Sequence, residues 1–464
     1  MYTTQTKQPY DVVIIGAGAS GAALLYTLAT YTNIEKIALV EKYAKPGQVN
    51  SKASNNSQTL HVGDIETNYS LEKVKDVHPA AMMVAHYAHM LPESEYKMFL
   101  FPTNKMVLAV GANEVAILEK RYIDLKPLFP DLQKLDRNGI ASVEPAVVLG
   151  RDPNVPLLAL YTTSGYAVDF EKLSISLIEN AVKNNKKIDT LFNYNVVRIV
   201  KSKIGYRLFM KDGSSIETKV LAVDADSYSL LLAQQLGYGK EFSLIPIAGS
   251  FYFSKKVLNG KVYTVQEPKL PFAAVHGDPD VNVPGQTRWG PTARFHPVLE
   301  ARNFSTTKHF FQSSGLVRGK TWLSFFKILL DPIRFKYLLE NMLYELPYVG
   351  TRMFIKNVRK IVPSMKVSDV KYAKGYGGMR LQRVDTNTKE MLLGEGKIIG
   401  NNAIFNMTPS PGASVCLFNA MRDAETIVGF IGGLAHFDSI AMRKDLYKKD
   451  VVGTNVSIHN TYVS

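Results

Sequence analysis

Three glycines and a glutamate near the start of the chain have the types and spacing of a nucleotide-binding site. The motif G-x-G-x-x-G runs from Gly16 to Gly21, after an apolar run at 11–15 that predicts a buried parallel strand. The glycines allow a tight turn, a close backbone approach to a pyrophosphate, and packing of the next helix on the strand. We expect the phosphates to lie at the N-terminus of this helix, because the free N–H groups and the helix dipole favour negative charge there.

A second predicted strand, at 36–40, ends at Glu41, whose carboxylate can accept hydrogen bonds from both hydroxyls of an adenosine ribose. Strand, turn, helix, strand and acid in this order form a narrower pattern than the glycines alone, which also occur in ordinary turns. The predicted cofactor contacts of this unit are Gly16, Gly18, Ala19, Ser20, Gly21, Glu41 and Lys42.

The pattern does not separate NAD from FAD. A chain with this unit at its start resembles flavoproteins, in which the adenosine of FAD occupies the first β-α-β unit. An additional NAD site would require a second glycine set of this kind, and none follows in the sequence. FAD is therefore the expected cofactor.

Length and composition limit the class of protein. A chain of 464 residues with 46% hydrophobic content suggests two or three domain-sized units with ample core. No stretch approaches the roughly 20 apolar residues of a membrane-spanning helix, and the first ten residues lack the apolar segment of a signal peptide. We expect an intracellular protein that does not span a membrane.

No metal site is predicted. The single cysteine, Cys416, excludes an internal disulfide and a cysteine metal cluster. His86 and His89 share a predicted helix but lack an acid at ligand spacing, which favours packing and surface positions.

The net charge of +14 suggests an acidic partner, which can be nucleic acid, an anionic membrane surface or a dianionic small substrate. Residues 301–360 hold eleven Lys and Arg against three acids, interleaved with bulky aliphatic and aromatic residues. This composition favours helices at a membrane interface, or helices packed on their own domain, over a nucleic-acid surface. We expect segment 318–360 to contact an anionic membrane, and we expect no nucleic acid to bind.

A polar loop at 51–69 follows the second strand and can fold back over the cofactor, although its composition equally suits a solvated surface loop. If it folds back, its amides and hydroxyls contact FAD and His61 lies near the flavin ring. The candidate cofactor contacts of this loop are Ser54, Asn55, Asn56 and Ser57.

Downstream, the pattern predicts a helix at 171–183 and strands at 195–201, 206–210 and 219–223. A hairpin-like insertion with a returning strand is the usual third layer of an FAD domain. Within it, the strand at Val196 and Val197 is positioned to cover the adenine, and Val197 is the candidate contact.

Residues 245–296 are rich in Pro and Gly and are interpreted as a mixed sheet over the flavin. His276 and Arg294 lie there, and Arg380 follows a glycine-rich stretch. Arginine can bind a carboxylate through two hydrogen bonds and imidazole can take a proton near neutral pH, although a lone histidine on a strand is more often structural. The helix predicted at 415–421 begins beside further candidate contacts, Ser410, Pro411, Gly412, Ala413 and Ser414.

The predicted fold class is α/β, with a Rossmann-like FAD-binding domain and a mixed-sheet substrate domain. The FAD-binding domain is assigned to 1–75, 150–240 and 370–434, and the substrate and membrane-facing domain to 76–149 and 241–369. Residues 435–464 are expected to form a basic tail.

The motifs SNNSQTLHVGDIETNYS, YAVDF, IPIAGSFYFS, FAAVHGDPDVNVPGQTRWGPTARF, GGMRLQRV and SPGAS, together with the N-terminal glycine motif, resemble the malate:quinone oxidoreductases over 11–427. That family belongs to a superfamily with D-amino-acid oxidase and L-2-hydroxyglutarate dehydrogenase. The resemblance implies a D-amino-acid oxidase-like two-domain flavoprotein at the inner face of the cytoplasmic membrane. It further implies oxidation of (S)-malate to oxaloacetate through FAD, with electrons passed to a quinone.

Carried over by this resemblance, His61 and His276 match histidines near the active site, and Arg380 matches the arginine expected to hold a substrate carboxylate. Arg294 follows a W-G-P-T-A segment that matches a family motif, and we expect it to pair the second carboxylate. Our hypothesis assigns the base to His276, with His61 as the alternative. The chain departs from the pattern after its third-layer strand, where it has Val-Asp-Ala-Asp at 223–226 instead of a glycine-rich turn.

Two other functions stay open at this point. The closer is another FAD-linked 2-hydroxyacid dehydrogenase, for example one acting on L-2-hydroxyglutarate. The more distant is a flavin-dependent enzyme that modifies nucleic acid.

Overall fold

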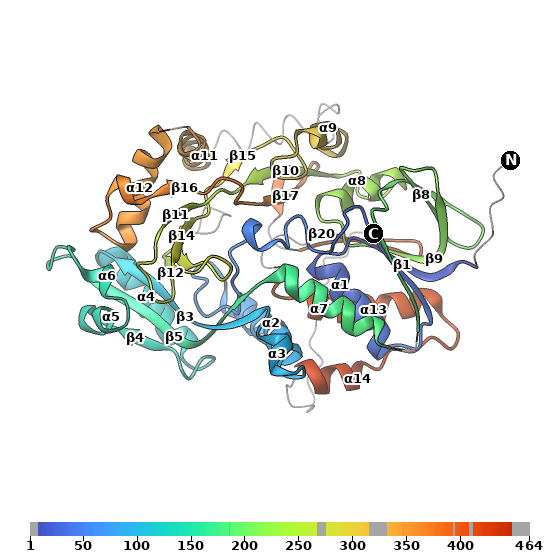
Figure 1. Cartoon of the computed structure of the whole chain (residues 1–464), viewed down its shortest axis with the longest axis horizontal. Coiled ribbons are helices and arrows are strands. Elements are labelled where there is room, and N and C mark those ends of the chain that lie inside the picture. Colours follow the sequence, from blue (N-terminus) through green and yellow to red (C-terminus); the bar gives the residue numbers. More distant parts are fainter. Residues whose placement is uncertain are drawn as a thin grey trace.

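The structure is a computed structural model that describes residues 8–184, 186–266, 275–314, 332–346, 348–392, 395–407 and 412–447. The chain folds into three sheets with helices packed around them, and its long axis runs from the nucleotide sheet at one end to a large mixed sheet at the other (Figure 1).

The nucleotide sheet has the strand order β19-β20-β9-β1-β2-β6. Its strands are β1 Tyr10–Ile15, β2 Lys36–Glu41, β6 Lys187–Phe192, β9 Ser215–Val223, β19 Gly396–Gly400 and β20 Ala403–Met407. The pairs from β20 to β6 are all parallel, so the carboxyl ends of β1, β2 and β9 meet at one edge. In open parallel sheets a ligand binds outside this edge, and the crevice described below opens there.

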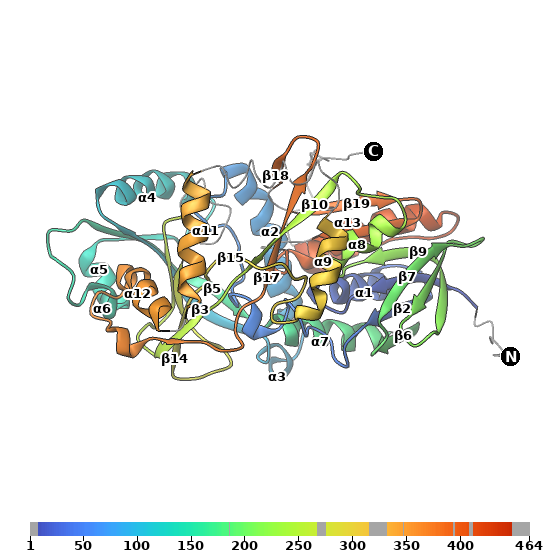
Figure 2. The same ribbon diagram turned by 90° about the horizontal axis from the view of Figure 1, so that it is seen from above.

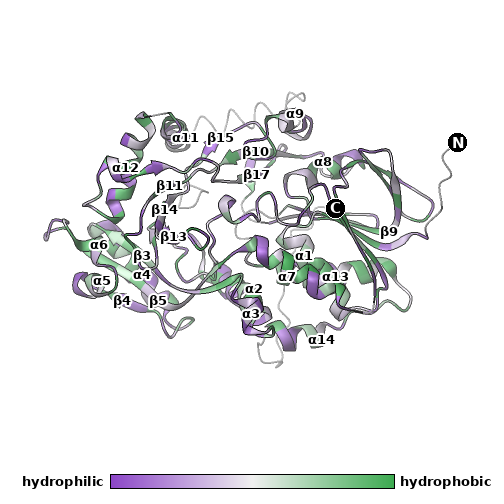
Figure 3. Cartoon of the chain, viewed as in Figure 1, coloured by the Kyte–Doolittle hydropathy of each residue, from purple (hydrophilic) through white to green (hydrophobic). Residues whose placement is uncertain are grey.

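Apolar residues cover both faces of this sheet. Helices α1 Ala19–Tyr31, α7 Phe170–Val182 and α13 Cys416–Ile431 pack on one face, with α1 in contact with both others. Figure 3 shows the apolar residues of these helices in green. On the other face, the antiparallel hairpin of β7 Val196–Lys201 and β8 Tyr206–Met210 joins β9, and α8 Ser227–Gln235 packs beside it.

Two further sheets complete the fold. An antiparallel sheet has the order β15-β10-β17-β18, with β10 Phe242–Ala248, β15 Arg294–Phe295, β17 Met379–Asp385 and β18 Glu390–Leu392. The mixed sheet has the order β16-β11-β14-β13-β12-β3-β5-β4. Its strands are β3 Leu100–Val110, β4 Gln133–Leu135, β5 Leu157–Val168, β11 Tyr252–Lys255, β12 Lys261–Thr264, β13 His276–Pro279, β14 Gln286–Gly290 and β16 Lys371–Tyr372.

The remaining helices lie around these sheets (Figure 2). They are α2 Leu71–His89, α3 Glu93–Tyr96, α4 Ala112–Leu125, α5 Arg137–Val143, α6 Pro145–Val148, α9 Thr307–Ser314, α11 Pro332–Tyr344, α12 Val349–Ile361 and α14 Ser439–Met442. Short turns of helix occur at η1 Ala53–Asn55, η2 Phe304–Thr306, η3 Val367–Asp369 and η4 Arg443–Tyr447.

The elements predicted from periodicity are confirmed: the strands at 11–15 and 36–40, the helix at 171–183, the hairpin and the mixed sheet all form. The boundaries differ in two places. Strand β9 begins at Ser215 rather than 219, and α13 continues to Ile431 rather than ending at 421.

The packing differs from the predicted domain limits in three places. Helix α2, assigned to the substrate domain, packs on α13 and within the core of α1. Strand β5, assigned to the FAD-binding domain, pairs with β3 in the mixed sheet. Residues 435–447 are not a free tail, because Met442 and Leu446 are fully buried against that same core. Residues 448–464 lie outside the described part of the chain.

A buried charged cluster, defined as Lys261, Asp278, Asp280 and Arg288, joins the mixed sheet to the polar loop. The Asp278 carboxylate lies 2.7 Å from Lys261 Nζ and 2.8 Å from Arg288 Nη2, and these three side chains are at most 1% exposed. Arg288 Nη1 donates to the Asn56 carbonyl at 3.0 Å, and Lys261 Nζ donates to the Ser57 carbonyl at 3.1 Å. The two cations together hold the pKa of Asp278 far below its usual range, although burial alone acts in the opposite direction.

Removing the Asp278 carboxylate leaves two buried cations without their shared anion. We expect Asp278→Ala to lose about 3–5 kcal/mol of stability, the usual cost of breaking a buried pair on one side. Chemical denaturation followed by circular dichroism measures the change. The exposed pair of Lys356 and Glu340, 3.5 Å apart, provides the matched control, and Glu340→Ala should cost less than about 1 kcal/mol. Equal losses in the two variants would contradict this account of the cluster.

Candidate active site

The glycine motif forms a close junction between β1, α1 and the end of β9. Gly16 has φ +107°, and a Cβ there would lie 2.4 Å from the Asp224 carbonyl oxygen. A Cβ on Gly21 would lie 1.9 Å from the Gly16 carbonyl oxygen. No other residue fits at these two positions without moving the backbone. The junction leaves a cavity over the N-terminus of α1.

This cavity, counted with its open mouth, encloses about 1690 Å³. Its lining runs from Glu41 at the end of β2 to Arg380 and Ser414, so one continuous cavity can hold an extended dinucleotide with a substrate beside it. Of the predicted residues in the first β-α-β unit, Gly16, Gly18, Ala19, Ser20, Glu41 and Lys42 line it, and Gly21 supports it from behind.

The nucleotide end is built around Glu41 at the end of β2. Its carboxylate accepts hydrogen bonds from the backbone N–H groups of Ala17 at 2.9 Å and Tyr43 at 3.0 Å, which orient it at the cavity wall. Lys42 pairs with Glu300 and lies 4.0 Å above the ring centre of Tyr228. Burial lowers the pKa of Lys42 to about 8, although the charges of Glu41 and Asp226 act in the opposite direction.

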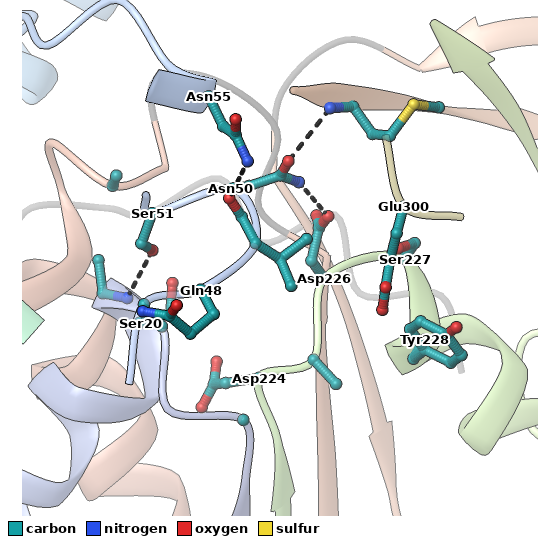
Figure 4. A pocket seen from close by; sticks show the side chains of 18 of the residues that line it. Ser20, Gln48, Asn50, Ser51, Asn55, Asp224, Asp226, Ser227, Tyr228 and Glu300 are labelled. Carbon is teal, nitrogen blue, oxygen red and sulfur yellow. Dashed lines mark hydrogen bonds between the residues drawn. The ribbon is translucent and has the colours of Figure 1, made fainter. Parts of the chain in front are cut away.

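The polar loop does fold back over this cavity. Figure 4 shows Asn50, Ser51 and Asn55 lining it, and Ser51 Oγ accepts the Ala19 N–H at 3.0 Å, at the N-terminus of α1. Asn56 and Ser57 also line the cavity, whereas Ser54 does not. Val196 lines the cavity in place of the predicted contact Val197, whose side chain is 47% exposed.

Two acids, Asp224 and Asp226, stand at the phosphate end, where the sequence departs from a glycine-rich turn. Asn50 Nδ2 donates to Asp226 at 2.6 Å, and Asn406 Nδ2 donates to Asp224 at 2.9 Å and to Asp423 at 2.6 Å. Burial raises the pKa of Asp226 to about 6. Burial and the nearby Asp423 raise the pKa of Asp224 to about 7. Protonation therefore reduces negative charge where phosphates would lie.

His61 lies at the opposite end of the cavity. Its Nδ1 is 2.5 Å from Glu66 Oε1, and its Nε2 is 3.2 Å from Ser57 Oγ. Its backbone N–H donates to Ser414 Oγ at 3.0 Å, which brings the polar loop next to the segment before α13. A histidine paired with a carboxylate at one nitrogen can take a proton at the other.

His276 occupies a different position, behind the cavity wall. It is fully buried on β13, stacks on the Tyr263 ring with centres 4.3 Å apart, and its Nε2 lies 3.8 Å from Asp278. It is absent from the cavity lining, although Tyr263 connects it to the lining residue Thr59 through a 2.6 Å hydrogen bond.

The two predicted arginines differ in their partners. Arg380, on β17, also lines the cavity, and within the described part of the chain no carboxylate forms an ion pair with it. Burial lowers its pKa, with Tyr337 and Tyr263 acting in the opposite direction, and guanidinium stays charged. Arg294 lies outside the lining and is 3.6 Å from the Glu345 carboxylate. Its positive charge is therefore already matched within the protein.

Of the segment before α13, Ala413 and Ser414 line the cavity, and Gly412 is buried without lining it. The predicted contacts Ser410 and Pro411 lie outside the described residues. Sequence reasoning missed Gln48, Asn50 and Glu66. Glu66 had a detectable signal, because an acid five positions after a candidate histidine on one loop can fold back onto it.

The fold and this cavity define a class: a two-domain protein with the architecture of FAD-linked oxidases. Glycine oxidase from Geobacillus kaustophilus has a similar fold, with a TM-score of 0.64 at 15% identity over 91% of this chain and 95% of that one. The FAD-bound L-α-glycerophosphate oxidase from Mycoplasma pneumoniae matches with a TM-score of 0.61 at 19% identity, over 91% of this chain and 95% of that one.

The sequence comparisons narrow this class. The model of the malate:quinone oxidoreductase family matches residues 8–422. A probable malate:quinone oxidoreductase from Campylobacter jejuni is 45% identical, covering 92% of this chain and 97% of the relative. The malate:quinone oxidoreductase of Helicobacter pylori is 41% identical, covering 95% and 99%. The chain belongs to the malate:quinone oxidoreductase family.

The raised pKa of Asp224 predicts a particular dependence of stability on pH. A carboxyl whose pKa rises from about 3.9 in the unfolded chain to about 7 when folded stabilises the protein fully below pH 4, and this contribution is lost as the pH rises through 7. This difference in pKa between the folded and the unfolded chain corresponds to at most about 4 kcal/mol of folding free energy. Asp224→Asn, which cannot ionise, should therefore gain more thermal stability relative to the parent protein at pH 8 than at pH 5.

Thermal denaturation between pH 5 and pH 8 tests this expectation. Asp212→Asn, in an exposed turn, is the control and should leave the pH profile of the parent unchanged. A constant difference between Asp224→Asn and the parent across this range would refute a protonated Asp224.

Proposed function

We propose that the protein oxidises (S)-malate to oxaloacetate with FAD as cofactor and a membrane quinone as electron acceptor. The observation that carries this proposal is the shared cavity, in which the nucleotide cradle at Glu41 continues to Arg380 and His61. Membership of the malate:quinone oxidoreductase family supports the same reaction.

The cavity residues fit FAD. The glycine junction and the N-terminus of α1 would hold the pyrophosphate, Glu41 would accept hydrogen bonds from the ribose hydroxyls, and Asn55, Asn56 and Ser57 would offer hydrogen bonds toward the ring end. When bound, FAD would supply the two-electron acceptor of the reaction.

The protein's own residues bind malate and move its proton. Arg380 binds one malate carboxylate through its paired N–H donors and fixes the position of C2. His61 Nε2 takes the proton of the C2 hydroxyl while the C2 hydrogen leaves as a hydride, so the C–O bond becomes the ketone of oxaloacetate. His276 as the base stays a prediction, but its place behind the wall favours His61. The same geometry favours Arg380 over Arg294 as the carboxylate ligand.

We further propose that the enzyme docks on the inner face of the cytoplasmic membrane through α11 and α12. Four apolar residues at helical spacing, Phe335, Leu339, Met342 and Leu346, are 47–53% exposed on one face of α11 and its end. Arg352, Lys356 and Arg359 are exposed on the adjoining α12. An apolar stripe beside cations matches acyl chains below anionic headgroups.

The other face of α11 packs on the antiparallel sheet of β10, β15 and β17. Asn341 is 3% exposed and its side-chain oxygen accepts the Ala293 N–H at 2.7 Å. Helix α11 is thus held to β15 on one side (Figure 2), and its apolar stripe is exposed. Among the described residues, no helix is long and apolar enough to cross a membrane. Residues 318–331 and 347 of the predicted membrane segment lie outside the described part.

Anaerobic mixing of the FAD-loaded protein with L-malate tests the reaction. We expect loss of the flavin absorbance, restored by a soluble quinone and not by NAD. Arg380→Met should reduce kcat/KM for malate by about 100-fold or more, because the carboxylate loses a charged bidentate partner worth about 3 kcal/mol. Arg294→Met is the matched control and should retain most activity. If L-2-hydroxyglutarate bleaches the flavin and malate does not, the substrate is L-2-hydroxyglutarate instead of malate. If no 2-hydroxyacid bleaches the flavin, the proposed function is refuted.

Sedimentation with anionic vesicles tests the membrane surface. The parent protein should bind at low salt, and Leu339→Asp with Met342→Asp should weaken binding by at least tenfold, since two charges replace buried apolar contacts. The control is Ile123→Asp with Leu149→Asp, which alters two apolar residues that are 72% and 68% exposed outside α11 and α12. Equal binding by both variants would exclude α11 as the docking surface.

A further inference from the structure

The cavity histidine His61 is held by a carboxylate that does not itself reach the cavity. Glu66 Oε1 lies 2.5 Å from His61 Nδ1, and the side chains of His61 and Glu66 are 14% and 9% exposed. His61 lines the cavity and Glu66 does not. Any effect of Glu66 on a bound substrate must therefore pass through the imidazole ring.

Glu66 is itself fixed by its surroundings. Its second oxygen, Oε2, accepts the Gly63 N–H at 2.8 Å, and its backbone carbonyl accepts a hydrogen bond from Arg121 Nη2 at 3.1 Å. Lys105, which pairs with Asp64 at 2.7 Å, is 1% exposed and adds positive charge nearby. Burial alone would raise the pKa of Glu66, but the hydrogen bond and charge of His61, together with Lys105, lower it. The carboxylate is ionised and accepts a proton donor at a defined position.

The other side of the ring is held as well. Ser57 Oγ lies 3.2 Å from His61 Nε2, and the Ser57 carbonyl accepts Lys261 Nζ from the buried charged cluster. An ionised Glu66 cannot donate to His61, so Nδ1 carries the hydrogen and Nε2 keeps its lone pair. Ser57 can donate to that lone pair or rotate away from it, because a hydroxyl hydrogen is free to turn.

We propose that Glu66 is a positioning residue that fixes the Nδ1–H tautomer and the ring orientation of His61, leaving Nε2 as the proton acceptor toward the cavity. This inference rests on the proposed function. In the reaction, the hydroxyl proton of the substrate moves to Nε2, and the two electrons of the C2–H bond leave with the hydrogen, for which bound FAD would be the acceptor. The resulting imidazolium carries a positive charge that the Glu66 carboxylate stabilises at 2.5 Å.

The first test compares Glu66→Gln with the parent enzyme. The glutamine side chain has nearly the same shape as glutamate but can donate to Nδ1, which permits the wrong tautomer. We expect kcat for malate to fall about 10- to 100-fold with less than a threefold change in KM, because the loss falls on proton transfer rather than on carboxylate binding. Glu66→Asp, which restores an acceptor, should recover part of kcat.

The second test reads the tautomer without turnover. In protein with ¹⁵N-labelled histidine, the His61 signals are assigned from their loss in His61→Gln. The parent should show a protonated Nδ1 and an unprotonated Nε2, and Glu66→Gln should show a mixture. Because this spectrum needs neither malate nor quinone, it remains readable if the proposed reaction fails and malate does not bleach the flavin.

Glu144→Gln serves as the structural control. Glu144 is also buried and accepts backbone N–H groups, those of Asn259 and Gly260, but it does not line the cavity. This variant should lose stability and keep kcat. An unchanged His61 tautomer in Glu66→Gln would overturn the proposal. So would a fall in kcat that only parallels losses of FAD content and melting temperature, as in a purely structural variant.

Discussion

The active end of the cavity depends on one buried interaction, the Asp278 carboxylate held between Lys261 and Arg288. Both cations also donate to carbonyl groups of the polar loop, at Ser57 and Asn56. Charges are costly to bury unless they are paired and fully hydrogen-bonded, so this cluster forms only when loop and sheet meet in one geometry. The mixed sheet therefore positions the part of the loop at Asn56 and Ser57, whereas Ser51 is held at the N-terminus of α1.

The result is a cavity with two chemically different ends built by different elements. At the nucleotide end, backbone N–H groups, Glu41 and the close glycine junction come from β1, α1 and β2, which are consecutive in the chain. At the substrate end, His61 comes from the loop and Arg380 from β17, more than three hundred positions later. Helix α11 lies between this interior and the outer surface. Tyr337 on this helix lies near Arg380, so one helix relates the proposed membrane contact to the substrate end of the cavity.

Much of this was predictable from local patterns. The strand, turn, helix, strand and acid unit appeared at its expected positions because each part depends on near neighbours in the chain. The strands β7, β8 and β9 followed from their apolar residues and from the Asp-Gly turn at 212–213, which connects β8 to β9. The domain limits were less accurate. Strand β5 pairs with β3 and α2 packs on α13, and both contacts join residues too far apart for any periodicity to reveal. The Val197 contact moved by one residue, since alternate side chains of a strand face opposite sides.

The sequence by itself determined the nucleotide site, the fold class and, through its motifs, the family, because these depend on residue types at fixed spacing. It also identified two histidines and two arginines as candidates, and it placed His276 ahead of His61 as the base. Only the tertiary structure separated them: Arg294 is matched by Glu345 and His276 is enclosed behind Tyr263, whereas Arg380 and His61 line the cavity. The physical reason is that a side chain's availability depends on its burial and on its charge partner. Both are supplied by segments distant in the chain, as Glu345 for Arg294 and β12 for His276 illustrate.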